Sequence, residues 1–292
     1  MSETAPHSID RYAVIGSGVQ YSRSPQIHAL FAAATHQFLH YGLIDVPPSG
    51  FAQAARDFFA TGGRGLNVTV PFKESALALA TTLTPRARRA GAVNTLARGA
   101  ALIEVDRAVR TLLGDNTDGA GLVRDLTINL SCTLRGARVR LLGAGGAARG
   151  IIAPLLESGV ASLVIHNRHA DRAQQLASEF ADLGPVSPGS AGSSVDLSAV
   201  DLIVNATSAS LNGELPLVPA GAVGAQTLCY DCAYGERDTV FVHWARSAGA
   251  ARAVMGFGML VEQAAESFLL WRGVRPDTVP VLAALGFTVA PA

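Results

Sequence analysis

The stretch that decides the fold is RVRLLGAGGAARG, residues 138–150. Residues 138–142 are typical of a buried strand, and residues 143–148 match the G-x-G-x-x-A pattern of dinucleotide-binding turns. Glycine at the first two positions lets the backbone approach a pyrophosphate, and the following helix, expected at 150–157, presents its positive end to that anion. The candidate cofactor-binding residues of the turn are Gly143, Ala144, Gly145, Gly146 and Ala147.

The end of the next strand indicates which dinucleotide is preferred. A strand at 162–166 and a further helix follow, which completes the context that the turn requires. NAD-binding proteins usually carry Asp or Glu at this point, where the carboxylate accepts from the ribose 2′-hydroxyl. This chain instead has Asn167 and Arg168, with Arg172 four residues after Arg168. Two guanidinium groups and no carboxylate favour a 2′-phosphate, so these three residues predict NADP(H) as the cofactor.

Length and composition exclude several classes of protein. The 292 residues suggest two domains, at about 100–200 residues each, and 49% hydrophobic against 16% charged residues excludes a disordered chain. Lys+Arg and Asp+Glu both total 23, so no net charge favours nucleic acid or an anionic membrane. The polar N-terminus is unlike a signal peptide, and three cysteines are too few for a disulfide framework. We expect a cytoplasmic monomer or homodimer that binds a small molecule, without nucleic-acid or membrane partners.

Strands alternate with helices along both halves of the chain, which implies parallel strands joined by crossovers. We expect Pro71 to open a helix, because the first helical position tolerates proline, and residues 114–121 to form a turn. The predicted fold class is α/β, with an open mixed or parallel N-terminal domain and a doubly wound Rossmann-type domain. The expected divisions are a substrate-binding catalytic domain at 1–118, an NADP-binding domain at 119–255, and C-terminal helices at 256–292 that return to the first domain.

The single lysine of the chain lies at a place suited to acid–base chemistry. The basic residues comprise 22 arginines and Lys73, and arginine cannot replace lysine where a group must gain and lose a proton. Lys73 ends the segment NVTVPFK (67–73), between a parallel strand and a helix, at the sheet edge where open α/β proteins bind ligands. An enzyme that reduces a ketone by hydride transfer needs a proton donor for the new alkoxide. Asp118 or Asp115 could hold Lys73 in that role.

Motifs along nearly the whole chain resemble the shikimate dehydrogenase family, and they occur in that family's order. The resemblance implies a two-domain α/β enzyme that reversibly reduces 3-dehydroshikimate to shikimate with NADPH, a step in chorismate and aromatic amino acid biosynthesis. The matching segments are YAVIG (12–16), SRSPQIH (22–28), NVTVPFK (67–73), GAVNTL (91–96), LLGDNTDGAGL (112–122), LLGAGGAARG (141–150), NATS (205–208), YDCAY (230–234) and GMLVEQAAESFLLWRG (258–273).

The same resemblance implies a role for individual residues. It makes Lys73 and Asp118 the catalytic pair, and it places Cys232 and Gly256 along the nicotinamide of the cofactor. Hydroxyl groups can donate to the carboxylate of a small polyhydroxy acid, and amides and carboxylates can bind its ring hydroxyls. The implied substrate-binding residues are Ser22, Ser24, Thr69, Asn94, Tyr234 and Gln263.

Three positions depart from the pattern of the family. Tyr21 stands where the family usually has His, Met255 where it usually has Asp, and Pro85 where some members carry an acid. All three leave Lys73 and Asp118 in place, so they bear on efficiency and substrate range more than on reaction class. The alternatives are a paralogue that acts on quinate or aminoshikimate, with NADP or NAD, and a non-catalytic NADP-binding sensor.

Other short patterns favour ordinary structural roles. Cys229 and Cys232 are three positions apart, which in a strand places them on opposite faces, and no second pair of metal ligands follows them. His36 and His40 have the spacing of a helical metal pair but no adjacent Glu, so we expect a partly exposed helix face and no metal. The remaining pattern is a basic cluster that we expect to be solvated: Arg86, Arg88 and Arg89.

Overall fold

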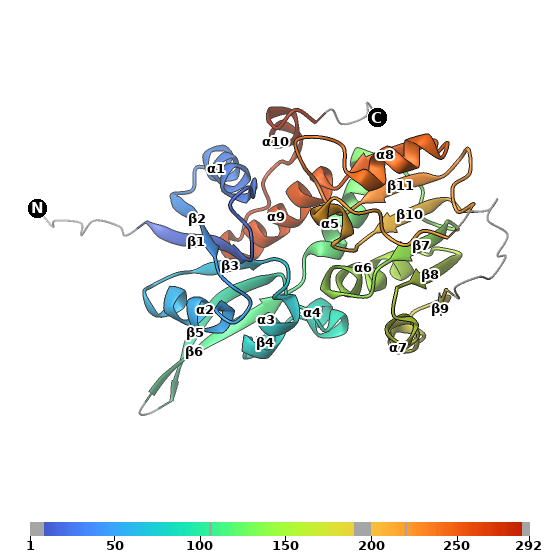
Figure 1. The fold of residues 1–292 in the computed structure, drawn as a ribbon. Helices are drawn as coiled ribbons and strands as arrows, with labels where there is room; N and C mark the ends of the chain where they lie inside the picture. Colours follow the sequence, from blue (N-terminus) through green and yellow to red (C-terminus); the bar gives the residue numbers. More distant parts are fainter. Residues whose placement is uncertain (1–8, 105–106, 190–199, 220, 288–292) are drawn as a thin grey trace, which may run out of the picture. The chain divides into compact units, whose positions relative to one another are not determined.

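The computed structural model describes residues 9–104, 107–189, 200–219 and 221–287 (Figure 1). The chain divides into two compact units. One unit comprises Met1–Thr117 and Ala264–Val281, and the other comprises Asp118–Gln263 and Leu282–Ala292. Within the described residues, each unit is built around one six-stranded sheet with helices packed on it, which confirms the α/β class. None of the helices in these ranges is long and apolar enough to cross a membrane.

The sheet of the second unit is parallel throughout its described strands, which run in the order β12-β11-β10-β7-β8-β9. This is the doubly wound order, in which the direction of winding reverses between β7 and β10. Ligands of such sheets bind beyond the carboxyl ends of the strands at that reversal. The strands are β7 (Arg138–Leu142), β8 (Ser162–His166), β9 (Val186–Pro188), β10 (Leu202–Asn205), β11 (Leu228–Asp231) and β12 (Arg252–Met255).

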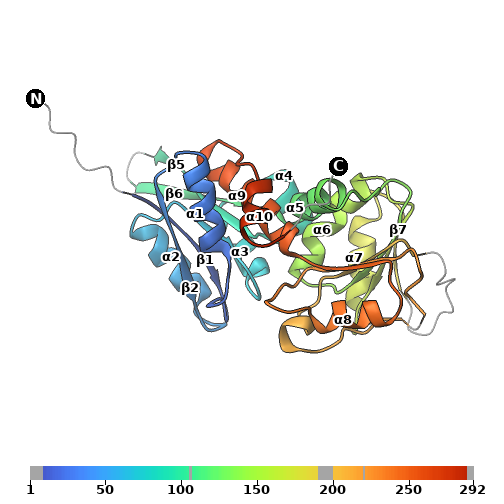
Figure 2. The ribbon, with the colours of Figure 1, turned by 90° about the horizontal axis from the view of Figure 1, so that it is seen from above.

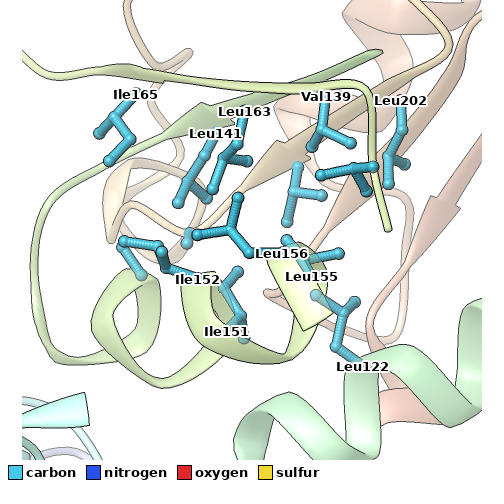
Figure 3. Packing of buried hydrophobic residues seen from close by; sticks show 14 of the residues in the cluster. Leu122, Val139, Leu141, Ile151, Ile152, Leu155, Leu156, Leu163, Ile165 and Leu202 are labelled. Atoms are coloured by element: carbon cyan, nitrogen blue, oxygen red, sulfur yellow. The ribbon is translucent and has the colours of Figure 1, made fainter. Parts of the chain in front are cut away.

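Helices cover both faces of this sheet because successive strand residues point to opposite sides. Val139 and Leu141 of β7 pack in the cluster with α6 (Gly146–Glu157) and α7 (Ala170–Phe180). Figure 3 shows the strand residues of this cluster against the aliphatic side chains of α6. Leu142 faces the other way, toward apolar residues of α8 (Val240–Ser247), which lies on the opposite face (Figure 2). Each fully buried aliphatic side chain contributes about 1.5–3 kcal/mol to such a core.

The sheet of the first unit is mixed, with the order β2-β1-β3-β5-β6-β4. Strand β1 pairs in parallel with β2 and β3, whereas β5 runs antiparallel to both β3 and β6. The carboxyl ends of β1 and β3 therefore meet at the same edge of the sheet. The strands are β1 (Asp10–Gly16), β2 (Leu39–Asp45), β3 (Gly65–Val68), β4 (Thr82–Leu83), β5 (Thr95–Glu104) and β6 (Arg107–Asp115).

Two clusters pack on the faces of the first sheet. Ala13 and Ile15 of β1 contact aromatic and small residues of α2 on one face. Tyr12 and Val14 lie on the other face, where the Tyr12 ring packs with its centroid 4.8 Å from that of Trp271 in α9, the two planes tilted by 30°. The helices that lie wholly in this unit are α1 (Ser24–Ala34), α2 (Phe51–Ala60), α3 (Lys73–Leu79) and α4 (Pro85–Ala90). The remaining described helices are α5 (Asp118–Arg124), the π-helix at Asp125–Asn129, the 3₁₀-helix at Ala209–Asn212, α9 (Phe257–Arg272) and α10 (Val279–Ala284).

Several predicted boundaries were wrong. Pro71 does not open a helix: it lies in a turn after β3, and α3 begins at Lys73. The expected turn at 114–121 is instead the end of β6 and the start of α5, because Asp115 still pairs with β5 and Asp118 is already helical. The helix after the glycine turn begins at Gly146 and not near 150, because glycine and alanine tolerate the helical backbone at the first turn.

The sequence pattern also missed short elements. Strand β12 was not predicted, since its four residues are bounded by exposed and small residues with little periodicity. The expected helix face for His36 and His40 was wrong. His36 follows α1 with a left-handed φ of 53°, and His40 belongs to β2. Within the described residues, no group of His, Cys, Asp and Glu is arranged to hold a metal ion.

Candidate functional site

The glycine turn joins three neighbouring strands of the second sheet. The Gly143 N–H donates to the carbonyl of His166 at 2.8 Å, which ties the end of β7 to the end of β8. Gly143 has a φ of +114°, a conformation that residues with a side chain rarely adopt. A Cβ at this position would also lie 3.1 Å from the carbonyl of Ala206, just after β10. Glycine is therefore required where the turn sits at the reversal of the sheet.

Gly145 has a different reason to be glycine. It caps the N-terminus of α6 with an ordinary φ of −96°, and a Cβ built on it meets no heavy atom within 4 Å. Among the described residues, no side chain caps this end of α6, which is 12 residues long. The N–H groups of the first helical turn and the positive end of the helix dipole thus face a space that a side chain would fill. A pyrophosphate fits this cradle.

The residues after β8 fit a phosphorylated ribose. The Asn167 side chain donates from Nδ2 to the carbonyl of His169 at 3.1 Å, which shapes the turn into α7. Arg168 lies in that turn, Arg172 lies in the first part of α7, and both side chains are exposed. No carboxylate of the described residues forms an ion pair with either guanidinium group. Both can therefore pair with an added phosphate.

A buried polar network shapes the loop that follows β10. Asn205 accepts from the N–H and the hydroxyl of Thr207 at 3.0 and 2.7 Å, and its Nδ2 donates to Asp231 at 3.0 Å. The carboxylate of Asp231 also accepts from the hydroxyls of Ser210 and Thr239, each at 2.6 Å. Burial raises the pKa of Asp231, although these hydrogen bonds oppose the shift. Sequence reasoning missed Asp231, although the motif YDCAY contained it.

Cys232 and Gly256 lie beside this network. The Cys232 N–H donates to the carbonyl of Asn205 at 2.8 Å, just past the ends of β10 and β11. A Cβ on Gly256 would lie 2.8 Å from the carbonyl oxygens of Asp231 and Cys232, so only glycine allows this close approach. The structure therefore brings these two predicted cofactor residues together. Cys229 is buried against α8, and burial raises its pKa to about 12, which keeps its thiol protonated.

In the first unit, four predicted residues follow β1 and β3 in the chain. Ser22 precedes α1 and donates from its hydroxyl to that of Ser24 at 3.1 Å, while the Ser24 N–H donates back to Ser22 Oγ at 3.2 Å. Thr69 follows β3, and its N–H donates to the carbonyl of Ile15 at 3.0 Å. The turn after β3 leads to Lys73, the first and half-buried residue of α3.

Asn94 is held by the loop that precedes Asp118. Its Nδ2 donates to the hydroxyl of Thr117 at 2.8 Å, and the Thr117 N–H donates to Asn94 Oδ1 at 2.9 Å. Both residues are buried, so these hydrogen bonds are shielded from water. The segment LLGDNTDGAGL thus meets GAVNTL through a side-chain amide, although sequence alone did not connect the two motifs.

Asp115 has a structural ion pair, which separates it from Asp118. The Asp115 side chain is 1% exposed and accepts from Arg86 Nε at 2.8 Å and from Arg86 Nη2 at 2.6 Å. It also accepts from the Thr84 hydroxyl at 2.5 Å. Burial alone would raise the pKa of Asp115, but the hydrogen bonds and charge of Arg86 outweigh it and leave the pKa lowered. The prediction of a solvated basic cluster was therefore wrong for Arg86, which also pairs with Glu266 at 3.3 Å.

Replacing Arg86 by alanine is expected to lower the free energy of unfolding by about 3 kcal/mol at pH 7, because a buried carboxylate loses its partner. The paired Asp115 has a lowered pKa in the folded state, so its stabilisation is present above the unfolded value of about 3.9 and is lost as pH falls through the folded pKa. Urea unfolding at pH 7 and below pH 4 measures this. A difference between wild type and variant that stays constant with pH would contradict the assignment.

The second unit contains the other predicted substrate residues. Asp118 is buried at the first position of α5, and Gln263 lies on α9, where its Nε2 donates to the carbonyl of Leu260 at 2.8 Å. A Cβ on Gly121 would lie 2.7 Å from the backbone nitrogen of Gln263, so α5 and α9 pack closely here. Tyr234 packs its ring 5.0 Å from that of Phe257, at the start of the same helix.

The three departures from the family pattern lie in different surroundings. Tyr21 is 88% exposed, next to Ser22. Pro85 is the first residue of α4, after Thr84, whose hydroxyl accepts from the Ala87 N–H at 3.2 Å and caps the helix. Met255 ends β12 and packs against the cluster between the sheet and α8. Only Met255 directly precedes a residue of the predicted cofactor site.

The doubly wound sheet, its glycine turn and the two exposed arginines define a dinucleotide-binding α/β protein with features of a nicotinamide-dependent oxidoreductase. The chain belongs to the shikimate dehydrogenase family. It matches the shikimate dehydrogenase substrate binding domain over residues 14–96, the shikimate / quinate 5-dehydrogenase model over 126–215, and the shikimate 5′-dehydrogenase C-terminal domain over 256–285. The resemblance inferred from the sequence motifs is thereby confirmed.

Relatives and solved structures match nearly the whole chain. Shikimate dehydrogenase (NADP(+)) from Alkalilimnicola ehrlichii is 52% identical over 276 residues, which covers 94% of this chain and 98% of that protein. The crystal structure of an Ael1 enzyme from Pseudomonas putida is 43% identical, with a TM-score of 0.81 and coverage of 94% and 98%. Shikimate 5-dehydrogenase from Thermus thermophilus, in complex with NADP(H) and shikimate, is 32% identical, with a TM-score of 0.77 and coverage of 92% and 96%.

Proposed function

We propose that the protein is an NADP-dependent shikimate dehydrogenase, which reversibly reduces 3-dehydroshikimate to shikimate. The observation that carries the proposal is the match of 94% of the chain to relatives named shikimate dehydrogenase (NADP(+)). The only lysine of this chain lies at the start of α3, after the turn that follows β3. This reaction would place the protein in the biosynthesis of aromatic amino acids. The exposed Arg168 and Arg172 support NADP as the cofactor, and the cradle at Gly145 supports binding of its pyrophosphate.

Lys73 would act as the acid and base of the reaction. Bound NADPH would supply the hydride. The ammonium group of Lys73 would give its proton to the substrate oxygen during reduction and take it back during oxidation. Asp118 would hold Lys73 in place for this transfer. Asp115 is not proposed for that role, because Arg86 already occupies both of its carboxylate oxygens.

The remaining site residues would bind the substrate by their hydrogen-bonding groups. The hydroxyls of Ser22, Ser24 and Tyr234 would donate to its carboxylate, and polar side chains would bind its ring hydroxyls. Shikimate is a small anion with several hydroxyls, which suits a site rich in neutral donors and amides. The residues proposed for the ring hydroxyls are Asn94, Asp118 and Gln263, with Thr69 as a further substrate-binding residue. Those proposed to line the nicotinamide are Cys232 and Gly256.

We also propose which domain binds the substrate and which binds the cofactor. The N-terminal domain, 1–118, would bind the substrate, and residues 119–255 would bind NADP. Of the C-terminal residues 256–292, Ala264–Val281 would complete the first domain, since only they group with the first unit. We further propose that the protein works in the cytoplasm as a monomer or homodimer, without nucleic-acid or membrane partners.

The cofactor assignment is tested by a double variant, Arg168→Ser with Arg172→Ser. We expect the KM for NADP to rise about 100-fold, since two lost charge-assisted hydrogen bonds cost about 1.5 kcal/mol each, while the KM for NAD changes less than about twofold. Initial rates of shikimate oxidation measure both constants. Arg135→Ser is the matched control, because Arg135 is exposed and precedes β7, at the other end of that strand from the turn. An equal rise for NADP and NAD would contradict recognition of the 2′-phosphate.

A further inference from the structure

The strongest unassigned feature of the first unit is a hydroxyl buried on α9. Ser267 is 0% exposed, and its Oγ has three polar neighbours on strands and loops far away in the sequence. Asn67 Nδ2 donates to it at 2.9 Å, Thr95 Oγ1 lies at 2.8 Å, and Thr117 Oγ1 lies at 3.4 Å. Ser267 is thus the point at which α9 joins the polar groups of β3, of β5 and of the loop after β6.

The orientation of the Asn67 amide is fixed from both ends. Its Oδ1 accepts from the Tyr41 hydroxyl at 2.8 Å, and its Nδ2 donates to Ser267 Oγ at 2.9 Å and to Thr95 Oγ1 at 3.2 Å. Tyr41 is itself held by the ring of His28, stacked at 4.1 Å. Burial lowers the pKa of His28 to about 3, so this ring is neutral. In this orientation both polar atoms of the Asn67 amide have hydroxyl partners.

Because Ser267 has a single proton, the network has a direction. Ser267 accepts from Asn67, and it is the donor in its 2.8 Å contact with Thr95, because the single hydroxyl proton of Thr95 goes to Asn94 Oδ1. The Thr95 hydroxyl donates to Asn94 Oδ1 at 2.9 Å. Asn94 Oδ1 also accepts from the Thr117 N–H at 2.9 Å. The hydrogen bonds from Ser267 to Thr95 and from Thr95 to Asn94 thus help to hold Asn94 Oδ1 as the acceptor end of the amide.

We propose that Ser267 is a positioning residue that orients the amide of Asn94, through Thr95, for binding the ring hydroxyls of the substrate. The inference rests on the proposed function, in which Asn94 binds substrate. Asn67, which Ser267 and Tyr41 hold from opposite ends, keeps the serine hydroxyl directed at Thr95. Buried hydroxyl and amide groups that satisfy one another in this way form a rigid support, and rigid support of a binding group lowers the cost of binding.

The test is a double-mutant cycle between Ser267→Ala and Asn94→Ala, read as the dissociation constant of shikimate by calorimetry. In the wild-type background, Ser267→Ala is expected to raise the KM and the dissociation constant for shikimate about tenfold, with kcat and the KM for NADP within about twofold. In the Asn94→Ala background, the same substitution is expected to change the dissociation constant by less than about twofold, because the group it orients is gone.

Further variants separate positioning from a general loss of structure. Ser267→Cys keeps a weak acceptor and donor of similar shape and should recover part of the affinity. Thr35→Val is the control: it also removes a partly buried hydroxyl from the first unit, one that donates only to the backbone of Phe31, at 2.7 Å. It should leave shikimate binding unchanged. Thermal melts verify that each variant is folded at the temperature of the assay.

The outcomes separate this inference from the proposed function. Wild-type protein that does not oxidise shikimate with NADP would overturn the proposed function and this role of Ser267 with it. Wild-type turnover, combined with unchanged shikimate affinity in Ser267→Ala, would overturn the inference alone. So would an equal loss of affinity from Ser267→Ala with and without Asn94, because that result would show a structural effect independent of the amide.

Discussion

Replacing Lys73 by alanine is expected to lower kcat for shikimate oxidation by roughly 100- to 10,000-fold, the range that a positioned acid–base group contributes. Lys73 is the only lysine among 23 basic residues, and it lies at the first position of α3, after the four-residue turn that follows β3. The loss should appear in kcat more than in the affinity for NADP, because the glycine turn belongs to the other unit. Stopped-flow and steady-state rates, with NADP binding measured by fluorescence, check both parts.

Two matched substitutions define what Lys73 contributes. Lys73→Arg keeps the positive charge but cannot release a proton near neutral pH, so it should be nearly as slow as the alanine variant. Arg56→Ala removes an exposed cation from α2 of the same unit and should leave the rates unchanged. Full activity of Lys73→Arg would show that charge alone is needed, and full activity of Lys73→Ala would remove Lys73 from the mechanism.

Substituting valine for Gly145 should abolish NADP binding while leaving the fold intact. The backbone of Gly145 has a φ of −96°, which any residue adopts, and a Cβ there meets no heavy atom within 4 Å. A branched side chain would fill the space above the N-terminus of α6, so the affinity for NADP should fall by about 100-fold or more as the pyrophosphate loses the helix N–H groups. Calorimetric titration with NADP and a thermal melt measure the two effects separately.

Gly143 provides the contrast for this experiment. Valine at Gly143 would require a φ of +114° and would meet Ala206 at 3.1 Å, so it should reduce stability as well as binding. We therefore expect Gly145 to be needed for NADP binding and Gly143 to be needed for the backbone conformation of the turn. Normal NADP affinity in Gly145→Val would show that the pyrophosphate binds elsewhere.

The sequence predicted best where a motif and a periodic pattern coincide locally. RVRLLGAGGAARG combines an apolar strand with a turn whose glycines allow the backbone to approach a pyrophosphate. Strands β7 and β8 and the turn between them lie at the predicted residues. Helix α6 nevertheless begins earlier than expected, since a glycine-rich turn and a first helical turn share the same residue types. Strand β12 was missed, although β10 and β11 are equally short and strands were predicted at both places.

Contacts between distant residues were beyond the sequence pattern. Arg86 was expected to be solvated, yet its half-buried side chain pairs with the buried carboxylate of Asp115, 29 residues away. Nothing near Arg86 in the sequence points to that carboxylate, because the two meet only when β6 and α4 pack in the fold. The same holds for Ser267, whose neighbours in the network are 150 to 200 residues distant in the chain.

The choice between two aspartates shows how structure narrows a chemical hypothesis. Asp115 and Asp118 are equally plausible partners of Lys73 in the sequence GDNTDG, since both are carboxylates in one short segment. The ion pair with Arg86 explains why Asp115 is there: it fixes the end of β6. Asp118 is buried at the first position of α5, and it stays the proposed partner of Lys73 because Arg86 already occupies the other carboxylate of the segment.

The most direct test of the central claim compares four reactions of the purified protein: shikimate or quinate, each with NADP or NAD. The rate is the growth of the reduced-nicotinamide absorbance, expressed as kcat/KM. We expect rapid reduction of NADP by shikimate, with quinate and NAD each at least about tenfold less efficient, which equals about 1.4 kcal/mol of discrimination in the transition state. A higher kcat/KM for quinate or for NAD, or no turnover with any pair while NADP still binds, would contradict this expectation.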